Sequence, residues 1–120
     1  MKINPNVLRK KVIDMVRAKQ SGHIGGCFSM AELTSVLYEE YEMGGRDKLI
    51  LSKGHAVPII YAALHEMGEI TDEELDLFRE IDSPLQGHPD KERLPILDAT
   101  TGSLGQGLSI AIGHSLGKKL

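Results

Sequence analysis

The sequence lacks tryptophan, has a single cysteine among its 120 residues, and contains no apolar run long enough to cross a bilayer. One thiol, Cys27, cannot form an internal disulfide, which is typical of proteins in reducing compartments. The first residues interrupt their apolar positions with charge, whereas a secretory signal needs a continuous apolar centre. We therefore expect a cytoplasmic protein with no membrane association.

An excess of positive charge is also missing. Lysine and arginine number 14 against 17 aspartates and glutamates, so the net charge is -3 and no basic surface for nucleic acid is expected. The 41% hydrophobic and 26% charged content is typical of a globular chain, whose core must use aliphatic side chains and methionine because only 4% of residues are aromatic. This length suits one modest domain over residues 1–120 and excludes two independent domains.

Apolar residues recur at spacings of three and four in several segments that are bounded by glycine, proline or capping residues. This pattern predicts helices between Pro5 and Ser21, Ser29 and Gly44, Pro58 and Gly68, Thr71 and Ile81, and Leu108 and Leu116. The sequences SMAE and TDEE at the starts of the second and fourth of these helices fit capping boxes. In the second helix we expect the apolar side chains to be buried, namely Leu33, Val36, Leu37 and Tyr41.

The segments between these helices differ in character. Residues 22–28 begin with three glycines in five positions and should form no regular element. The apolar run at residues 49–51 suits a buried parallel strand that delivers the loop at residues 52–55. A single strand has no partner for its backbone groups, so the chain is expected to be part of a larger domain. Residues 82–95 are polar, contain three prolines and should form a long surface loop.

Three histidines share a local pattern. His23, His55 and His88 each follow a glycine in an expected loop, where the imidazole can reach a ligand. Imidazole holds or releases a proton near neutral pH, so converging histidines could relay protons or bind hydroxyl and phosphate oxygens. The alternative, which spacing alone favours, is three unrelated surface histidines. His65 and His114 lie within expected helices, where packing or solvation explains them.

Metal binding and thiol chemistry have weaker support. The three loop histidines lie more than 30 positions apart and lack the paired spacing that makes a zinc motif specific, so no metal ligand is assigned. Cys27 has no CxxC partner and is best explained as a small packed thiol.

The glycine-rich run Gly102–Gly107 precedes the last expected helix. Its open backbone donors and the positive helix end could hold an anion, or the turn could pack on a flat heteroaromatic ring. A turn that allows close helix packing is the alternative. The order of its glycines differs from the dinucleotide-binding fingerprint, and no P-loop lysine follows.

Four motifs together resemble those of transketolases, in the same order along the chain. They are SGHIGG at 21–26, LSKGH at 51–55, QGHP at 86–89 and TTGSLGQG at 100–107. Their details are most similar to the amino-terminal subunit of split, two-gene transketolases. The resemblance implies that residues 1–120 are the incomplete amino-terminal portion of an α/β, thiamine diphosphate-binding domain. This portion should be mostly helical, with one or two strands of a parallel sheet.

The resemblance also implies a reaction, in which thiamine diphosphate and Mg2+ serve to move a two-carbon ketol unit from a ketose phosphate to an aldose phosphate. His23 and His88 would bind or deprotonate hydroxyls of the donor, and His55 would lie near the cofactor diphosphate and the substrate. The aminopyrimidine would meet Gly102, Ser103 and Leu104, mainly through backbone groups. The implied partners are sugar phosphates and a carboxy-terminal segment or subunit, in a homo-oligomer.

Some family features are missing from this sequence. The Gly-Asp-Gly motif that anchors metal and diphosphate, the glutamate that activates the aminopyrimidine and the basic residues for the sugar phosphate are expected beyond this chain. The chain alone should therefore be inactive. Gly44 and Gly45 replace a longer connection, and Ile24 and Ser103 stand where single-chain relatives have prolines. Alternatives are a 1-deoxyxylulose 5-phosphate synthase-like segment, which the motifs favour less, and a non-catalytic remnant or assembly module.

Overall fold

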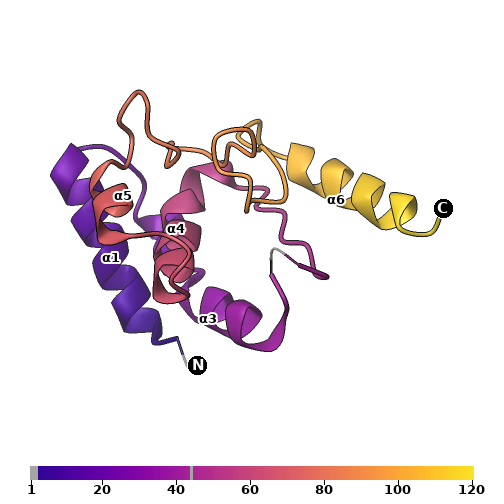
Figure 1. Ribbon diagram of the computed structural model, residues 1–120, viewed down its shortest axis with the longest axis horizontal. Coiled ribbons are helices and arrows are strands. Elements are labelled where there is room, and N and C mark those ends of the chain that lie inside the picture. Colours follow the sequence, from indigo (N-terminus) through magenta and orange to yellow (C-terminus); the bar gives the residue numbers. More distant parts are fainter. Residues whose placement is uncertain (1–2, 44) are drawn as a thin grey trace.

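The computed structural model describes residues 3–43 and 45–120, and the regular elements in these ranges are all helical (Figure 1). In chain order they are α1 (Pro5–Lys19), α2 (Gly25–Phe28), α3 (Ala31–Glu40), the 3-10 turn η1 (Gly54–Ala56), α4 (Val57–Glu66), α5 (Asp72–Asp76) and α6 (Gln106–Gly117). The expected mostly helical character is confirmed.

Helix α4 forms the centre of the core. Its residues 57–64 are all buried, and Pro58 sits in its first turn, where the missing N–H costs no hydrogen bond. A helix that is apolar on every side must be surrounded. Helices α1, α3 and α5 pack against it, and α1 contributes Leu8, Val12 and Met15 to the core.

Local capping explains where α1 and α5 begin. The side chain of Asn4 accepts a hydrogen bond from the Asn6 N–H, with Pro5 at the first helical position. Thr71 and Glu74 form the expected capping box, each accepting from the backbone N–H of the other at 3.2 and 2.8 Å. Both predicted helix starts are confirmed.

The prediction for the segment from 22 to 41 was wrong in two respects. Residues 25–28 form the short helix α2, and Ser29 caps its end by donating to the Gly26 carbonyl at 2.9 Å rather than starting a capping box for α3. The expected end of α3 at Gly44 lies outside the described residues, and the helix already ends at Glu40.

The buried face of α3 was also predicted wrongly. Leu33, Val36 and Tyr41 are about half exposed, at 53, 53 and 52%, and Leu37 is only half-buried. The buried side is lined instead by smaller or polar residues and one tyrosine, namely Ala31, Thr34, Ser35 and Tyr38. Small side chains let α3 approach α1 and α4 closely, which turns the larger apolar side chains outward.

No strand forms among the described residues, so residues 49–51 adopt neither a strand nor a helix. A strand needs a neighbouring backbone as partner. Here side chains take that place: the Leu49 N–H donates to Asp98 Oδ2 at 2.8 Å, and the Thr101 hydroxyl donates to the Leu51 carbonyl at 2.6 Å.

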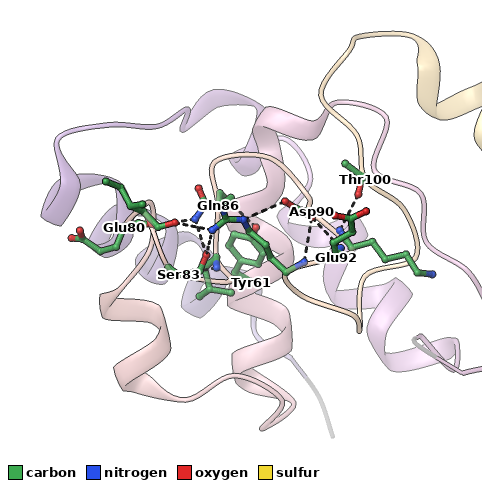
Figure 2. A network of polar contacts seen from close by, with 11 residues as sticks. Tyr61, Glu80, Ser83, Gln86, Asp90, Glu92 and Thr100 are labelled. Carbon is green, nitrogen blue, oxygen red and sulfur yellow. Dashed lines mark hydrogen bonds and ion pairs between the residues drawn. The ribbon is translucent and has the colours of Figure 1, made fainter.

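The long loop at residues 82–95 is present, but it does not simply run over the surface. Ser83, Leu85 and Pro89 are buried, and polar contacts tie the loop to α4 (Figure 2). It is therefore a packed loop.

Helix α6 begins near its predicted start and extends away from the other helices (Figure 1). The expected tight packing is confined to its first turn, where Gly107 is the buried residue. No helix in the described ranges is both long and apolar enough to cross a membrane.

Candidate functional site

The structure brings His23 and His55 together from two different loops. Their ring centroids are 5.1 Å apart, with the rings at 70° in an edge-to-face arrangement. His55 lies in η1, while His23 precedes α2. A Cβ atom placed on Gly26 would lie only 3.7 Å from Nε2 of His55, so α2 sits directly beside this ring.

His88 joins the same cluster through the turn at Gly102. A Cβ atom on Gly102 would lie 3.3 Å from Cδ2 of His88, so the absence of a side chain lets the imidazole pack on the turn. The Thr101 N–H donates to the Pro89 carbonyl at 3.2 Å, which connects the two segments through their backbones. Gly54, directly before His55, packs against the same turn, since its Cβ would lie 3.0 Å from the backbone N of Gly102, so the three histidines and the glycine turn share a single region.

The loop that carries His88 is held by a network of polar contacts, which Figure 2 shows. The Gln86 amide donates to the carbonyls of Glu80 and Ser83 at 2.8 and 2.7 Å. The Tyr61 hydroxyl donates to the Gln86 carbonyl at 2.8 Å and so connects the loop to α4. Because Gln86 lies two residues before His88, these contacts limit the positions that the backbone of His88 can adopt.

Burial and charge differ among the three imidazoles. His23 and His88 are exposed and His55 is half-buried. The pKa of His88 lies below the usual histidine value, because the surrounding groups displace part of its water and because Arg79, His55 and His23 add positive charge nearby. His88 is thus favoured in the uncharged form, which can accept a hydrogen bond or a proton.

Cys27 packs below the surface next to the loop of His23, in agreement with the prediction of a small packed thiol. It is fully buried, and its thiol donates to the His23 carbonyl at 3.1 Å. Burial raises the pKa of the thiol, so it stays protonated and keeps this hydrogen bond. Its role is to hold the loop of His23.

The remaining histidines lie on helices, outside the cluster. His65 on α4 contacts Asp72 at 2.9 Å and so ties α4 to the start of α5. His114 lies on α6. Ser103 and Leu104, two of the expected cofactor-binding residues, are exposed beside Gly102. Within the described ranges no group of three histidine, cysteine or acidic side chains is arranged to hold a metal ion.

Sequence reasoning missed Arg79. Its guanidinium lies against Gly87, since a Cβ atom on that glycine would come within 2.6 Å of Arg79 Cζ. Gly87 directly precedes His88, so a fixed cation adjoins the cluster. No motif includes this arginine, and only the fold of the loop brings it near the histidines.

Comparisons with known proteins agree with the motifs. The family described as the transketolase thiamine diphosphate binding domain matches residues 2–120. Human transketolase-like protein 2 is 43% identical over 116 residues, which are 90% of this chain and 18% of the human protein. Transketolase 1 of Saccharomyces cerevisiae is 37% identical over 123 residues, covering 96% of this chain and 18% of the yeast protein.

Solved structures give the same result. Transketolase from Leishmania mexicana superposes with a TM-score of 0.84 at 36% identity, covering 91% of this chain and 18% of the other. The chain thus spans a little under a fifth of the length of these relatives. The expected fold class, a mostly helical part of the α/β transketolase domain, is confirmed. The chain belongs to the transketolase family, as part of its thiamine diphosphate-binding domain.

Proposed function

We propose that this chain provides the amino-terminal part of a thiamine diphosphate site for ketol transfer between sugar phosphates. The observation that carries the proposal is the convergence of His23, His55 and His88, from three separate loops, around the turn at Gly102. Unrelated surface histidines would have no reason to meet at one place. The likeness to transketolases supports the same reaction class.

The residues present fit the ring portion of the cofactor. Gly102 offers backbone groups without a side chain, and Leu104 next to it is 68% exposed. A flat aminopyrimidine can pack against such a turn and hydrogen-bond to its backbone, including that of Ser103. When bound, thiamine diphosphate supplies the carbon nucleophile for breaking and forming the carbon–carbon bond.

The histidines have separate roles in this proposal. His23 and His88 are exposed and would face the substrate, where their imidazoles accept hydrogen bonds or protons from sugar hydroxyls. His55 is half-buried, and the preceding Gly54 packs against the Gly102 turn, so His55 would contact the cofactor diphosphate and the substrate. Its edge-to-face packing against His23 restricts the orientation of both rings.

The rest of the site is proposed to come from a carboxy-terminal segment or subunit. That part would supply the Mg2+ ligands, the glutamate for the aminopyrimidine and the basic residues for the sugar phosphate. The chain by itself would then be inactive, and the completed enzyme would be a cytoplasmic homo-oligomer such as a dimer.

A chimaera tests the proposal. Residues 1–120 would replace the matching segment of the Leishmania mexicana transketolase, and ketol transfer would be measured with and without thiamine diphosphate and Mg2+. We expect cofactor-dependent activity. Replacing His55 and His88 together by alanine should lower turnover by about 100-fold or more, since positioned acid–base groups contribute that much. His114→Ala on α6 is the matched control and should retain activity.

Two outcomes would refute the proposal. One is a folded chimaera without ketol transfer, although the parent enzyme is active under the same conditions. The other is full turnover and unchanged cofactor affinity, measured by calorimetry, after both histidines have been replaced.

A further inference from the structure

Arg79 has an unusual backbone conformation. Its φ is +63°, and Gln20 is the other non-glycine residue with a positive φ in the described ranges. Residues with a side chain adopt this conformation at an energetic cost. The Arg79 N–H donates to the Leu85 carbonyl at 2.9 Å, which closes the loop and fixes the direction in which the side chain leaves the backbone. Such strain often marks a functional position.

Two neighbours restrict the guanidinium. Its Cζ lies 5.6 Å from the ring centroid of Phe78, a fully buried residue, in a cation–π contact. The guanidinium also lies against Gly87, where a Cβ atom would come within 2.6 Å of Cζ and Nη2. Only a glycine leaves room for the guanidinium directly before His88. The charge is therefore fixed in place.

The charge is also unneutralised within the described ranges. No carboxylate lies within ion-pair distance of Arg79, and its Nε is buried without a hydrogen-bond partner. Arg93 on the same loop shows the contrast, because its Nε lies 3.5 Å from Asp90 and its Nη1 donates to the Ile81 carbonyl at 2.7 Å. Arg79 thus contributes a full positive charge to the histidine cluster.

We propose that Arg79 is a positioning residue of the cluster, whose clamped and unpaired guanidinium holds His88 in the uncharged form that accepts a proton or hydrogen bond from a substrate hydroxyl. A nearby cation disfavours the imidazolium ion. The lowered pKa of His88 agrees, with partial loss of water as its first cause and Arg79 as the next, ahead of His55 and His23.

Among the other charged groups near His88, Asp90 has the opposite sign, but its carboxylate is engaged by Glu92 and Arg93. The turn at residues 99–105 contains no titratable side chain. Asp90 follows on the same loop, and its carboxylate accepts from the backbone N–H groups of Glu92 and Arg93. His55 and His23 add positive charge when protonated. A role of Arg79 in the reaction rests on the proposed function. Its effect on the protonation of His88 does not.

The test measures the pKa of His88 in the ligand-free 120-residue chain, by NMR titration of its ring proton. Arg79→Met removes the charge and keeps an unbranched side chain, so the pKa of His88 should rise toward the usual histidine value. Arg79→Lys keeps the charge and should retain most of the lowering. Arg93→Met is the matched control: it leaves the charge next to Gly87 in place but removes the partner of Asp90, so it should raise the pKa of His88 less than Arg79→Met does.

The inference fails if Arg79→Met, with the loop signals unaltered, leaves the pKa of His88 as it was. It also fails if Arg93→Met raises that pKa equally, because the charge next to Gly87 would then have no effect beyond that of any arginine on the loop. If Arg79→Met does not fold, the pKa of His88 is measured in the wild-type chain at increasing ionic strength. Added salt screens a fixed charge, so this pKa should rise with ionic strength. A constant pKa overturns the inference.

The chimaera separates this inference from the proposed function. There Arg79→Met should move the acidic limb of the kcat/KM profile to higher pH and leave the dependence on cofactor unchanged. If the chimaera is inactive but Arg79→Met still raises the pKa of His88 in the NMR titration, only the proposed function is refuted. If the chimaera is active but Arg79→Met changes neither its pH profile nor the pKa of His88, only the role of Arg79 is refuted.

Discussion

At the scale of single residues, Gly54 sets the distance between two parts of the site. A Cβ atom at this position would lie 3.0 Å from the backbone N of Gly102 and equally close to the carbonyl of Thr101. These are backbone atoms, which cannot move aside as a flexible side chain can. The His55 turn and the Gly102 turn therefore touch only because residue 54 has no side chain.

Gly54→Ala should lower the free energy of unfolding by about 1–3 kcal/mol, as expected for overpacking in a close contact. It should also move the His55 ring away from Gly102. Urea unfolding measures the first effect, and NMR contacts between the rings of His55 and His23 report the second. Gly113→Ala on α6 is the control: its Cβ would meet nothing within 4 Å, so stability should stay the same or rise. Equal stability of the two variants would contradict the close contact.

The lowered pKa of His88 predicts a pH dependence of stability. In the unfolded chain a histidine titrates near pH 6.5, whereas the pKa of His88 in the folded chain is lower. At a pH between these two pKa values the unfolded state binds more protons than the folded state. The stability is therefore complete above about pH 6.5 and falls as the pH drops through the folded pKa. His88→Gln should flatten this part of the profile in urea unfolding, while His114→Gln should not. Identical profiles for wild type and His88→Gln would contradict the assignment.

Sequence reasoning reached these histidines but not their neighbours. A glycine before His23, His55 and His88 is visible in the sequence, because loop composition is a local property. The position of Arg79 against Gly87 depends on a loop closed by the Leu85 carbonyl and on a positive φ. Neither follows from local composition.

At the scale of elements, α3 is the helix whose orientation differs most from its sequence pattern. Ala31 is fully buried, whereas Leu33 is 53% exposed. An interpretation from hydrophobicity alone would assign the reverse. Core substitutions distinguish the two orientations because buried and exposed sites respond very differently.

Ala31→Leu should cost about 1–3 kcal/mol of unfolding free energy, since the close contact of α3 with α1 and α4 has no room for three more carbons. Leu33→Ala should change stability by less than about 0.5 kcal/mol. If Leu33 were in the core, its truncation would cost about 2–5 kcal/mol instead. Urea unfolding of both variants decides, and a larger loss for Leu33→Ala than for Ala31→Leu would overturn the observed orientation.

Helix positions were predictable because caps and turn residues act locally. Asn4 with Pro5 and the Thr71–Glu74 box mark starts that the structure confirms. The face that each helix buries depends on partners distant in sequence, which is why α3 was misjudged. The strand at residues 49–51 could not form for the same reason, since its hydrogen bonds need a neighbouring backbone and go here to Asp98 and Thr101.

At the scale of the whole molecule, the chain consists of a packed helical core and a last helix, α6, that is largely exposed. Helices α1, α3 and α5 bury α4, while α6 extends outward with Gly107 as its buried residue (Figure 1). Its side chains Leu108, Ile112 and Leu116 are spaced by four, so they form one apolar face, exposed at 67, 52 and 58%. A contiguous apolar face of this kind favours association.

The isolated chain should therefore self-associate through this face. Sedimentation velocity should show an average mass that rises with concentration, and replacing Leu108 and Ile112 together by glutamate should abolish the rise. Ile81→Glu, at an 84% exposed position on the loop after α5, is the matched control and should leave association unchanged. In the chimaera the remaining domain can cover the same face, so the double glutamate variant should there lower stability instead. The prediction is contradicted if the isolated chain stays monomeric at every concentration, or if the two glutamates do not change the stability of the chimaera.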